Sequence, residues 1–237
     1  MPSGVASADE IQVAVAANFT APMQKIAEEF ERETGHKPLL AFGTVGKFYA
    51  QIRSGAPFEA LVSSDQDTPD KLARDGLAVA DTRYTYAIGK LVLWSVAPGL
   101  VDSKGDVLKN GAFQHLALAN PKLAVYGAAG QEVLKKLGVW DAVQSKIVLA
   151  ENITQSYQFV ASGNAEIGFV ALSQIIGPGG KIEKGSAWTP PADLYPPIEQ
   201  DVILLSRGKG RAAALALVNY LKTDKARAII RAYGYQL

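Results

Sequence analysis

The 237-residue sequence has no cysteine and only two histidines, His36 and His115. Without cysteine, disulfides, thiolate metal sites and cysteine nucleophiles are all excluded. The two histidines leave little for histidine-based catalysis or a histidine-rich metal site, and no serine lies in a Gly-x-Ser-x-Gly nucleophile motif. We therefore expect that the chain is not an enzyme and that its side chains do not directly ligate a metal cation.

The sequence also lacks an excess of charge of either sign and a long hydrophobic run. Lys and Arg number 24 and Asp and Glu number 23, for a net charge of +1. This balance gives no reason to expect nucleic acid or an acidic membrane surface as a partner. No apolar run approaches the roughly 18 residues of a transmembrane helix. With 48% hydrophobic residues, the composition is that of a globular protein of one or two domains.

The N-terminus carries an indication of export. Ala6-Ser7-Ala8 has the small-x-small form of a signal-peptidase site, but the charged and apolar parts of a signal peptide are missing. We interpret residues 1–8 as a leader, the remnant of a removed signal peptide. The alternative is an unstructured leader without a targeting role. The absence of cysteine suits an exported protein.

Strand-like and helix-like segments alternate through most of the chain. The strand-like segments are 11–17, 38–42, 58–62, 84–96, 116–119, 147–150, 167–171 and 198–205. Two helix-like segments begin at Pro22 and at Thr68. The others cover residues 47–53, 101–111, 131–137, 155–162, 172–176, 209–222 and 224–233. Such alternation is the signature of an α/β protein whose parallel sheets carry helices on both faces.

Several local patterns carry expectations of their own. Thr68 is expected to cap the helix that it begins. The stretch 84–96 has the pattern of one long strand. Residues 120–127 are rich in turn-forming residues and residues 177–191 in Gly and Pro, so both are expected to be loops.

The strand pattern also indicates how the chain divides. The long strand near Tyr86–Lys90 and the segment near Tyr195–Glu199 are candidate crossings between two lobes. If both segments cross, the first lobe is built from both ends of the chain, residues 9–87 plus 198–237. The second lobe is then the middle, residues 88–197.

Small or polar residues stand between a strand and a helix at four junctions. These are Ala17-Asn18, Thr44-Val45-Gly46, Tyr126-Gly127-Ala128 and Ile153-Thr154, two in each expected lobe. A helix N-terminus presents free N–H groups and the positive end of its dipole, and α/β sheets bind ligands outside the carboxyl ends of their strands. Four converging junctions would surround an anion with neutral donors. The same residue types also favour ordinary turns, so the pattern alone leaves a structural role open.

Other motifs are incomplete. Gly43-Thr-Val-Gly46 is too short for a phosphate-binding P-loop. Asp65 and Asp67, with Glu59 nearby, could suggest a cation site, but the oxygen-ligand pattern is partial, and a solvated loop with a helix cap explains it.

Five segments and the C-terminal end together resemble a known family. They are Ala16-Ala-Asn-Phe-Thr-Ala-Pro22, Phe42-Gly-Thr-Val-Gly-Lys-Phe-Tyr-Ala-Gln-Ile52, Ser54-Gly-Ala-Pro-Phe58, Tyr84-Thr-Tyr-Ala-Ile-Gly-Lys-Leu-Val-Leu-Trp94, Gly168-Phe-Val-Ala-Leu172 and Tyr233-Gly-Tyr235. In this order, from about residue 10 onward, they are similar to the periplasmic molybdate-binding proteins of molybdate ABC importers. The resemblance implies a two-lobed type II periplasmic binding fold, in which each lobe is a mainly parallel sheet flanked by helices and two strands cross between the lobes.

The resemblance also implies a function. It is that of a periplasmic receptor that captures molybdate or tungstate in a hinged cleft, through hydrogen bonds and without a cationic side chain. The anion is the transported ligand, no cofactor is implied, and the partner is a membrane ABC permease. We expect a monomer, because the receptor must dock on a membrane complex.

The resemblance assigns the anion donors residue by residue. Ala17 and Asn18 follow the first strand, Thr44 and Val45 form the second loop, Tyr126 supplies a hydroxyl, and the backbone N–H of Ile153 is the last.

Two departures from the family pattern bear on these donors. The family usually has serine at the position of Val45, so one hydroxyl is lost, and Thr44 could compensate. Many relatives carry tyrosine where Ala171 stands, which makes Tyr126 the candidate tyrosine.

The chemistry of the anion agrees with a site of donors only. Molybdate, tungstate and sulfate are fully deprotonated dianions at neutral pH, so their oxygens only accept hydrogen bonds. Phosphate keeps a proton for part of its population and calls for an acceptor, of which Glu151 is the nearest to a junction. The alternatives are the same fold binding a sulfate-like oxyanion or ferric iron, although Tyr84, Tyr86 and Tyr195 form no obvious iron cluster. An enzyme on a similar scaffold is a further alternative.

Overall fold

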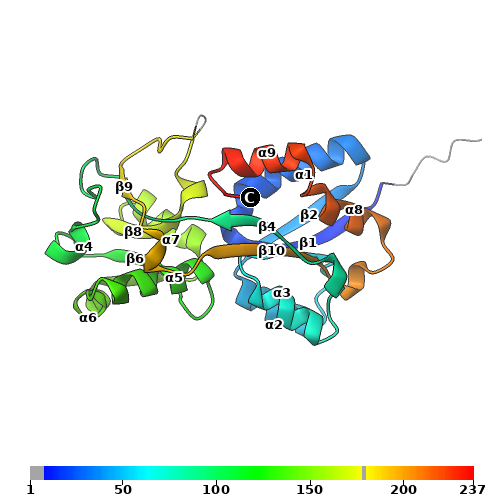
Figure 1. Ribbon diagram of the computed structural model, residues 1–237, viewed down its shortest axis with the longest axis horizontal. Coiled ribbons are helices and arrows are strands. Elements are labelled where there is room, and N and C mark those ends of the chain that lie inside the picture. The colour runs from blue at the N-terminus through cyan, green and yellow to red at the C-terminus, as the bar shows by residue number, and fades with distance from the viewer. Residues whose placement is uncertain (1–7, 178–179) are drawn as a thin grey trace, which may run out of the picture.

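The computed structural model describes residues 8–177 and 180–237 (Figure 1). The leader expected over residues 1–8 therefore lies outside the described residues except for Ala8, and so do residues 178–179 of the expected loop. Within the described ranges, no helix combines the length and the apolar character needed to cross a membrane.

The described residues form two five-stranded sheets. The first has the order β2-β1-β3-β10-β4, with bounds β1 Glu10–Ala16, β2 Lys37–Gly43, β3 Ala60–Val62, β4 Tyr84–Gly89 and β10 Ile198–Leu204. The second has the order β7-β6-β8-β5-β9, with bounds β5 Leu91–Ser95, β6 Leu116–Ala119, β7 Ile147–Ala150, β8 Ile167–Ala171 and β9 Ser186–Trp188. This is the expected two-lobed α/β fold.

Helices cover both faces of each sheet (Figure 1). They are α1 Thr20–Thr34, α2 Val45–Arg53, α3 Asp67–Arg74, α4 Val107–Asn110, α5 Val125–Lys136, α6 Trp140–Val143, α7 Ile153–Ala161, α8 Ala212–Tyr220 and α9 Asp224–Ala232. In the first sheet, Val13 and Val15 of β1 pack with α1, α8 and α9, whereas Ala14 packs with α2 and α3. The alternation of side chains along a strand thus supplies a core on each side.

In each sheet, one strand runs against the other four. In the first sheet it is β10, which is antiparallel to β3 and β4, and in the second it is β5, which is antiparallel to β8 and β9. The remaining pairs are parallel. Both reversed strands are those that the chain enters after crossing from the other sheet. The sheets are mainly parallel in strand direction because only the crossings reverse it.

The expectation of one long strand over residues 84–96 is corrected. The stretch is two strands, β4 and β5, that belong to different sheets and are separated by Lys90. Figure 1 shows β4 lying beside β10 in the middle of the molecule, where the two sheets meet. The strand-like pattern continues through Lys90, because β5 is buried throughout and half of β4 is buried, so the sequence gives no sign of the change of sheet.

Three further local expectations are corrected. Thr68 lies inside α3, and Asp65 acts as its cap, since the Asp65 carboxylate accepts from the Thr68 backbone N–H at 3.1 Å. The loop expected over 120–127 ends early, because α5 begins at Val125. The loop expected over 177–191 contains the edge strand β9, which pairs with β5.

Candidate functional site

A small cavity lies where the ends of both sheets meet. It encloses an empty volume of about 240 Å³, which includes solvent at its mouth. Its lining residues are Ala17, Asn18, Gly43, Thr44, Val45, Ser64, Ala124, Val125, Tyr126, Asn152 and Ile153. The structure therefore brings together around one cavity all six residues that the sequence placed at an anion site.

Each of these six residues lies at a junction where a strand is followed by a helix. Strand β1 leads into a 3₁₀ turn, Ala17–Phe19, and then α1; β2 leads into α2; β6 is followed by α5; and β7 by α7. The first N–H groups of a helix have no carbonyl partner within it. Helices from both sheets thus direct backbone donors and positive dipole ends at the cavity.

Thr44 is the N-cap of α2. Its hydroxyl oxygen accepts from the Lys47 N–H at 3.4 Å, and the side chain is 4% exposed. The hydroxyl keeps its own hydrogen for the cavity, because the cap uses only a lone pair. Val45 follows as the first helical residue and offers only its backbone N–H.

Tyr126 lies in the first turn of α5 and is buried. Its hydroxyl oxygen accepts from Gln200 Nε2 at 3.1 Å, so the hydroxyl hydrogen is left to donate. Burial, together with the neighbouring hydroxyl of Tyr235, raises the pKa of Tyr126 well above its ordinary value. The phenol therefore stays protonated at neutral pH and can serve as a donor.

A glycine makes room for this tyrosine. A Cβ on Gly127 would lie 2.1 Å from the Ala119 carbonyl oxygen, so only glycine lets the start of α5 lie so close to the end of β6. The N-terminus of α5 has no side-chain cap, which leaves its first N–H groups to the cavity.

Ile153 begins α7 behind a capping asparagine. Asn152 Oδ1 accepts from the Gln155 N–H at 3.0 Å. The cap uses the N–H of Gln155, so the N–H of Ile153, the first of the helix, is left without a partner inside the helix and can donate at the cavity.

The side chain of Asn18 is bonded within the protein. Asn18 Nδ2 donates to Gln200 Oε1 and to the Tyr235 hydroxyl, each at 3.0 Å. These two bonds use both hydrogens of the amide. In this arrangement Asn18 lines the cavity and holds Gln200 and Tyr235 with its side chain.

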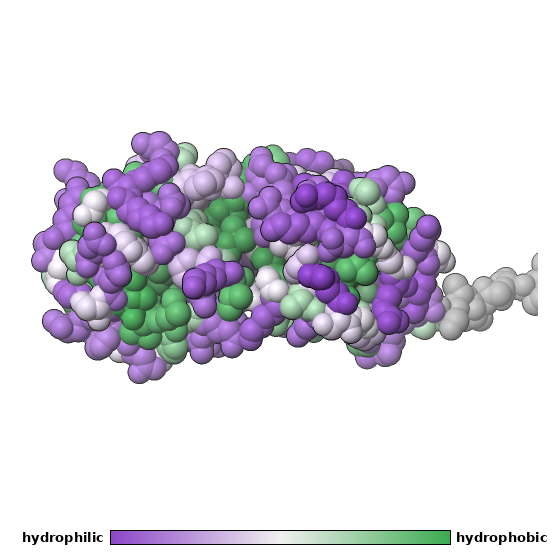
Figure 2. All heavy atoms as spheres, turned by 90° about the horizontal axis from the view of Figure 1, so that it is seen from below, coloured by the Kyte–Doolittle hydropathy of each residue, from purple (hydrophilic) through white to green (hydrophobic). Residues whose placement is uncertain are grey.

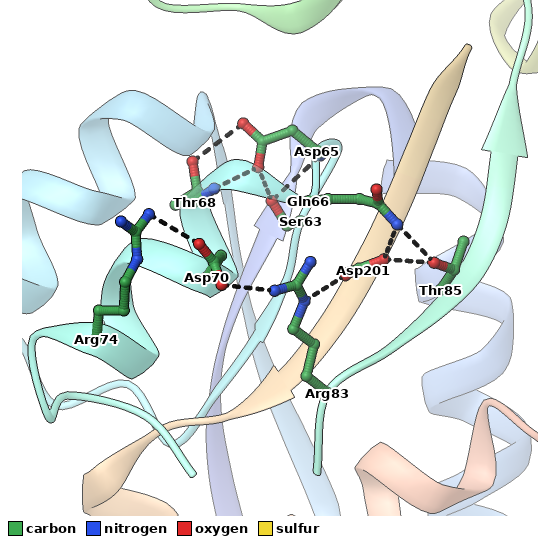
Figure 3. Close-up of polar contacts among 9 residues, drawn as sticks. All are labelled: Ser63, Asp65, Gln66, Thr68, Asp70, Arg74, Arg83, Thr85 and Asp201. Carbon is green, nitrogen blue, oxygen red and sulfur yellow. Dashed lines mark hydrogen bonds and ion pairs between the residues drawn. The ribbon is translucent and has the colours of Figure 1, made fainter. Parts of the chain in front are cut away.

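Ser64 is a cavity residue that the sequence analysis missed. It follows β3, and its neighbour Asp65 holds the loop by accepting from Ser63 Oγ at 2.9 Å and Thr68 Oγ1 at 3.0 Å (Figure 3). Burial raises the pKa of Asp65. The signal was present, because Ser63-Ser64 stands at the carboxyl end of a strand, as the other junctions do.

A second polar network lies behind this loop. The buried carboxylate of Asp201, on β10, pairs with Arg83 Nε at 2.6 Å and accepts from Thr85 Oγ1 at 2.7 Å (Figure 3). A β-bulge between Gln200 and Asp201 lets both consecutive side chains be buried. Gln200 contacts Tyr126 and Asn18 beside the cavity, whereas Asp201 joins β10 to β4 and Arg83.

No residue that lines the cavity within the described ranges carries a charge. A charged pair stands beside the lining residues Val45 and Asn152, where Lys47 of α2 forms an ion pair with Glu151, which follows β7. A groove continues outward between α2, α3 and the start of α5, and Figure 2 shows hydrophobic surface between the two halves of the molecule on this face. A site of neutral donors is suited to a small dianion, because no unpaired cation is buried when the site is empty.

Comparison with known proteins decides the family. The model for bacterial extracellular solute-binding proteins matches residues 11–236. The chain belongs to this family. Members of the family are extracellular by description, which places this solute-binding protein outside the cytoplasm.

Relatives of this solute-binding protein are named for molybdate. It is 57% identical over 232 residues to the molybdate-binding protein ModA of Azotobacter vinelandii, which covers 98% of this chain and 92% of that protein. It is 51% identical to ModA of Rhodobacter capsulatus, covering 97% of this chain and 89% of that protein. A solved periplasmic molybdate-binding protein of Azotobacter vinelandii has the same fold, with a TM-score of 0.93, 44% identity and coverage of 96% and 99% of the two chains.

Proposed function

We propose that this protein is an extracytoplasmic receptor that captures molybdate or tungstate and delivers the anion to a membrane ABC permease. Its relatives named above are molybdate-binding proteins. The anion is a transported ligand, so no cofactor takes part. We further propose that the protein acts as a monomer, binds no nucleic acid, catalyses no reaction and works in the periplasm after removal of a signal peptide.

The observation that carries this proposal is the donor set of the cavity. Helix N-termini from both sheets meet there, with the Thr44 and Tyr126 hydroxyls among them and no charged lining residue in the described part of the chain. Tetrahedral dianions without protons can only accept hydrogen bonds, and this cavity offers donors from every side. We propose Ala17, Asn18, Thr44, Val45, Tyr126 and Ile153 as the residues that bind the anion.

Capture would proceed by closure of two lobes, residues 9–87 plus 198–237 and residues 88–197. Two contacts already join the two proposed lobes next to the cavity. Thr154 Oγ1 donates to the Ala17 carbonyl at 3.2 Å, and the ion pair of Lys47 with Glu151 bridges the rim. Both contacts lie next to proposed donors, so closure and anion binding would stabilise each other.

The alternatives receive less support from the same residues. Ferric iron would call for ionised tyrosines, but burial raises the pKa of Tyr86 and of Tyr126 well above the ordinary value, which favours the neutral phenols. In residues 8–177 and 180–237, no three His, Cys, Asp or Glu side chains gather as metal ligands. A sulfate-like anion has the same donor requirement as molybdate and must be separated from it by experiment.

A thermal-shift panel on anion-stripped protein tests the proposal. Molybdate, tungstate, sulfate and phosphate are each added in excess, and the melting temperature is recorded. At one hundred times the dissociation constant, a ligand adds about 2.7 kcal/mol of stability, or roughly 5–11 °C for a protein of this size. A rise with molybdate and tungstate alone supports the proposal. A flat response to both, or a larger rise with phosphate, would refute it.

A further inference from the structure

Gln200 is a buried amide that lies beside the cavity without lining it. It belongs to β10, one of the strands that the chain enters after crossing between the sheets, and its exposed fraction is 0%. The β-bulge that follows it turns Asp201 toward a different set of partners. A buried glutamine in the middle of a strand is costly unless its polar atoms are bonded. The partners of Gln200 therefore indicate what it does.

Both ends of the Gln200 amide are bonded, and the two ends have different tasks. Its Oε1 accepts from Asn18 Nδ2 and from the Tyr86 hydroxyl, each at 3.0 Å. The single Tyr86 hydrogen is shared with the Ser63 carbonyl, also at 3.0 Å, but Asn18 and Tyr86 both present donors to the oxygen and so favour this orientation of the amide. The Nε2 end must then face Tyr126, to which it donates at 3.1 Å.

This contact keeps the Tyr126 hydroxyl hydrogen away from Gln200, so that it can face only the cavity or the neighbouring Tyr235 hydroxyl. A phenol oxygen that receives a hydrogen from Gln200 has its own hydrogen free to point elsewhere. We propose that Gln200 is a positioning residue, which holds Tyr126 as a hydrogen-bond donor toward an oxyanion in the cavity. The proposal rests on the proposed function, because it assigns Tyr126 to the anion.

The backbone makes room for the pair at Gly89. A Cβ on Gly89 would lie 2.1 Å from the Tyr126 hydroxyl oxygen and 2.5 Å from Gln200 Nε2. The absence of a side chain at position 89 thus lets the amide and the phenol meet between β4 and α5. Gly89 is the last residue of β4, directly before the crossing at Lys90, so the contact lies where the two sheets join.

The contact between Gln200 and Tyr126 depends on the hydrogen-bond donor of the amide as well as on the size of the side chain. In Gln200→Glu, the ionised carboxylate can only accept, so it would draw the Tyr126 hydrogen away from the cavity and add a negative charge beside the dianion. In Gln200→Met, the volume is nearly kept, but the donor is lost and the hydroxyl is free to rotate. Both variants should weaken anion binding, and Gln200→Glu should weaken it more.

The test is a double-mutant cycle with Tyr126→Phe, read by calorimetric titration of anion-stripped protein with molybdate at pH 8. Gln200→Met should weaken binding by about tenfold in the wild-type background and by less than about threefold in the Tyr126→Phe background, because its effect passes through the lost hydroxyl. Tyr86→Phe is the matched control. It removes one bond to Gln200 Oε1 and leaves the Nε2 contact, so affinity should stay within about threefold of wild type.

Each outcome separates the two proposals. If the wild type fails to bind molybdate, the proposed function is refuted, and the role of Gln200 that rests on it falls as well. If the wild type binds and Gln200→Met binds equally well, the role of Gln200 is refuted. An equal loss in both backgrounds would also refute it, since Gln200 would then act independently of Tyr126. Should Gln200→Met fail to fold, Gln200→Glu of nearly equal shape decides, and unchanged affinity in that variant overturns the proposal.

Discussion

Replacing Tyr126 by phenylalanine removes one hydroxyl from the cavity and little else. The ring stays buried in the core of the second sheet, where Tyr126 packs with Leu118 and Phe169. Among the described residues, the hydroxyl accepts from Gln200 Nε2 at 3.1 Å and lies beside the Tyr235 hydroxyl. The change therefore removes a donor to the anion and leaves Gln200 without its acceptor.

The magnitude follows from these two losses. A hydrogen bond to a charged group contributes about 1.5–3 kcal/mol, which corresponds to roughly a ten- to hundredfold increase in the dissociation constant of molybdate. The unbonded Gln200 amide costs about 1–3 kcal/mol of folding stability. That cost is present with and without the anion, so it lowers the melting temperature but cancels from the affinity.

Calorimetric titration with molybdate measures the affinity, and thermal unfolding of the anion-free protein measures the stability. Tyr84→Phe is the matched control, because the Tyr84 hydroxyl donates to the Val218 carbonyl at 2.5 Å, away from the cavity. It should change stability alone. If Tyr126→Phe binds molybdate within twofold of wild type, the tyrosine does not donate to the anion and the donor set is wrong.

Three other predictions address the loop, the network behind it and the buried phenols. Val45→Ser adds a hydroxyl at the start of α2 and should tighten molybdate binding by about tenfold in calorimetry; unchanged affinity would show that the new hydroxyl does not reach the anion. Arg83→Met should lower the free energy of unfolding in urea by about 3 kcal/mol, because it leaves the buried Asp201 carboxylate without its ion-pair partner, whereas an unchanged urea midpoint would contradict this role. Burial raises the pKa of Tyr235 to about 12, above the value near 10 of an unfolded tyrosine. The folded state therefore holds this proton longer, so stability should fall between pH 10 and 12, by up to about 1.4 kcal/mol per pH unit, and Tyr235→Phe should reduce that fall; equal falls in both proteins would argue against it.

Much of the fold was predictable because glycine, proline and small polar residues stand at many ends of strands and helices. Helix α1 ends where Gly35 adopts a φ of 76°, a conformation that favours glycine and marks a helix end in the sequence. The start of α5 was missed because Asn120, Pro121 and Gly127 favour a loop locally. Only the close approach of Gly127 to the end of β6 shows that a helix fits there. Local patterns do not contain such tertiary contacts.

The candidate site was predictable in part for the same reason. A residue at the end of a strand is visible in the sequence, so all six expected residues meet at the cavity. The partners of a side chain are not visible when they lie far along the chain. Asn18 bonds to Gln200 and Tyr235, 182 and 217 positions away. The sequence alone therefore could not show that this amide is bonded within the protein, and the network around Gln200 had no local signal.

The central claim is that a cavity of neutral donors binds a dianion that carries no proton. Titration of anion-stripped wild-type protein with molybdate, in two buffers of different ionisation enthalpy at pH 7.5, tests it most directly. The account predicts one anion bound per chain and the same heat in both buffers, because neither the anion nor Tyr126 changes its protonation. A heat that depends on the buffer would reveal proton uptake or release and would contradict the claim, as would the absence of any molybdate binding.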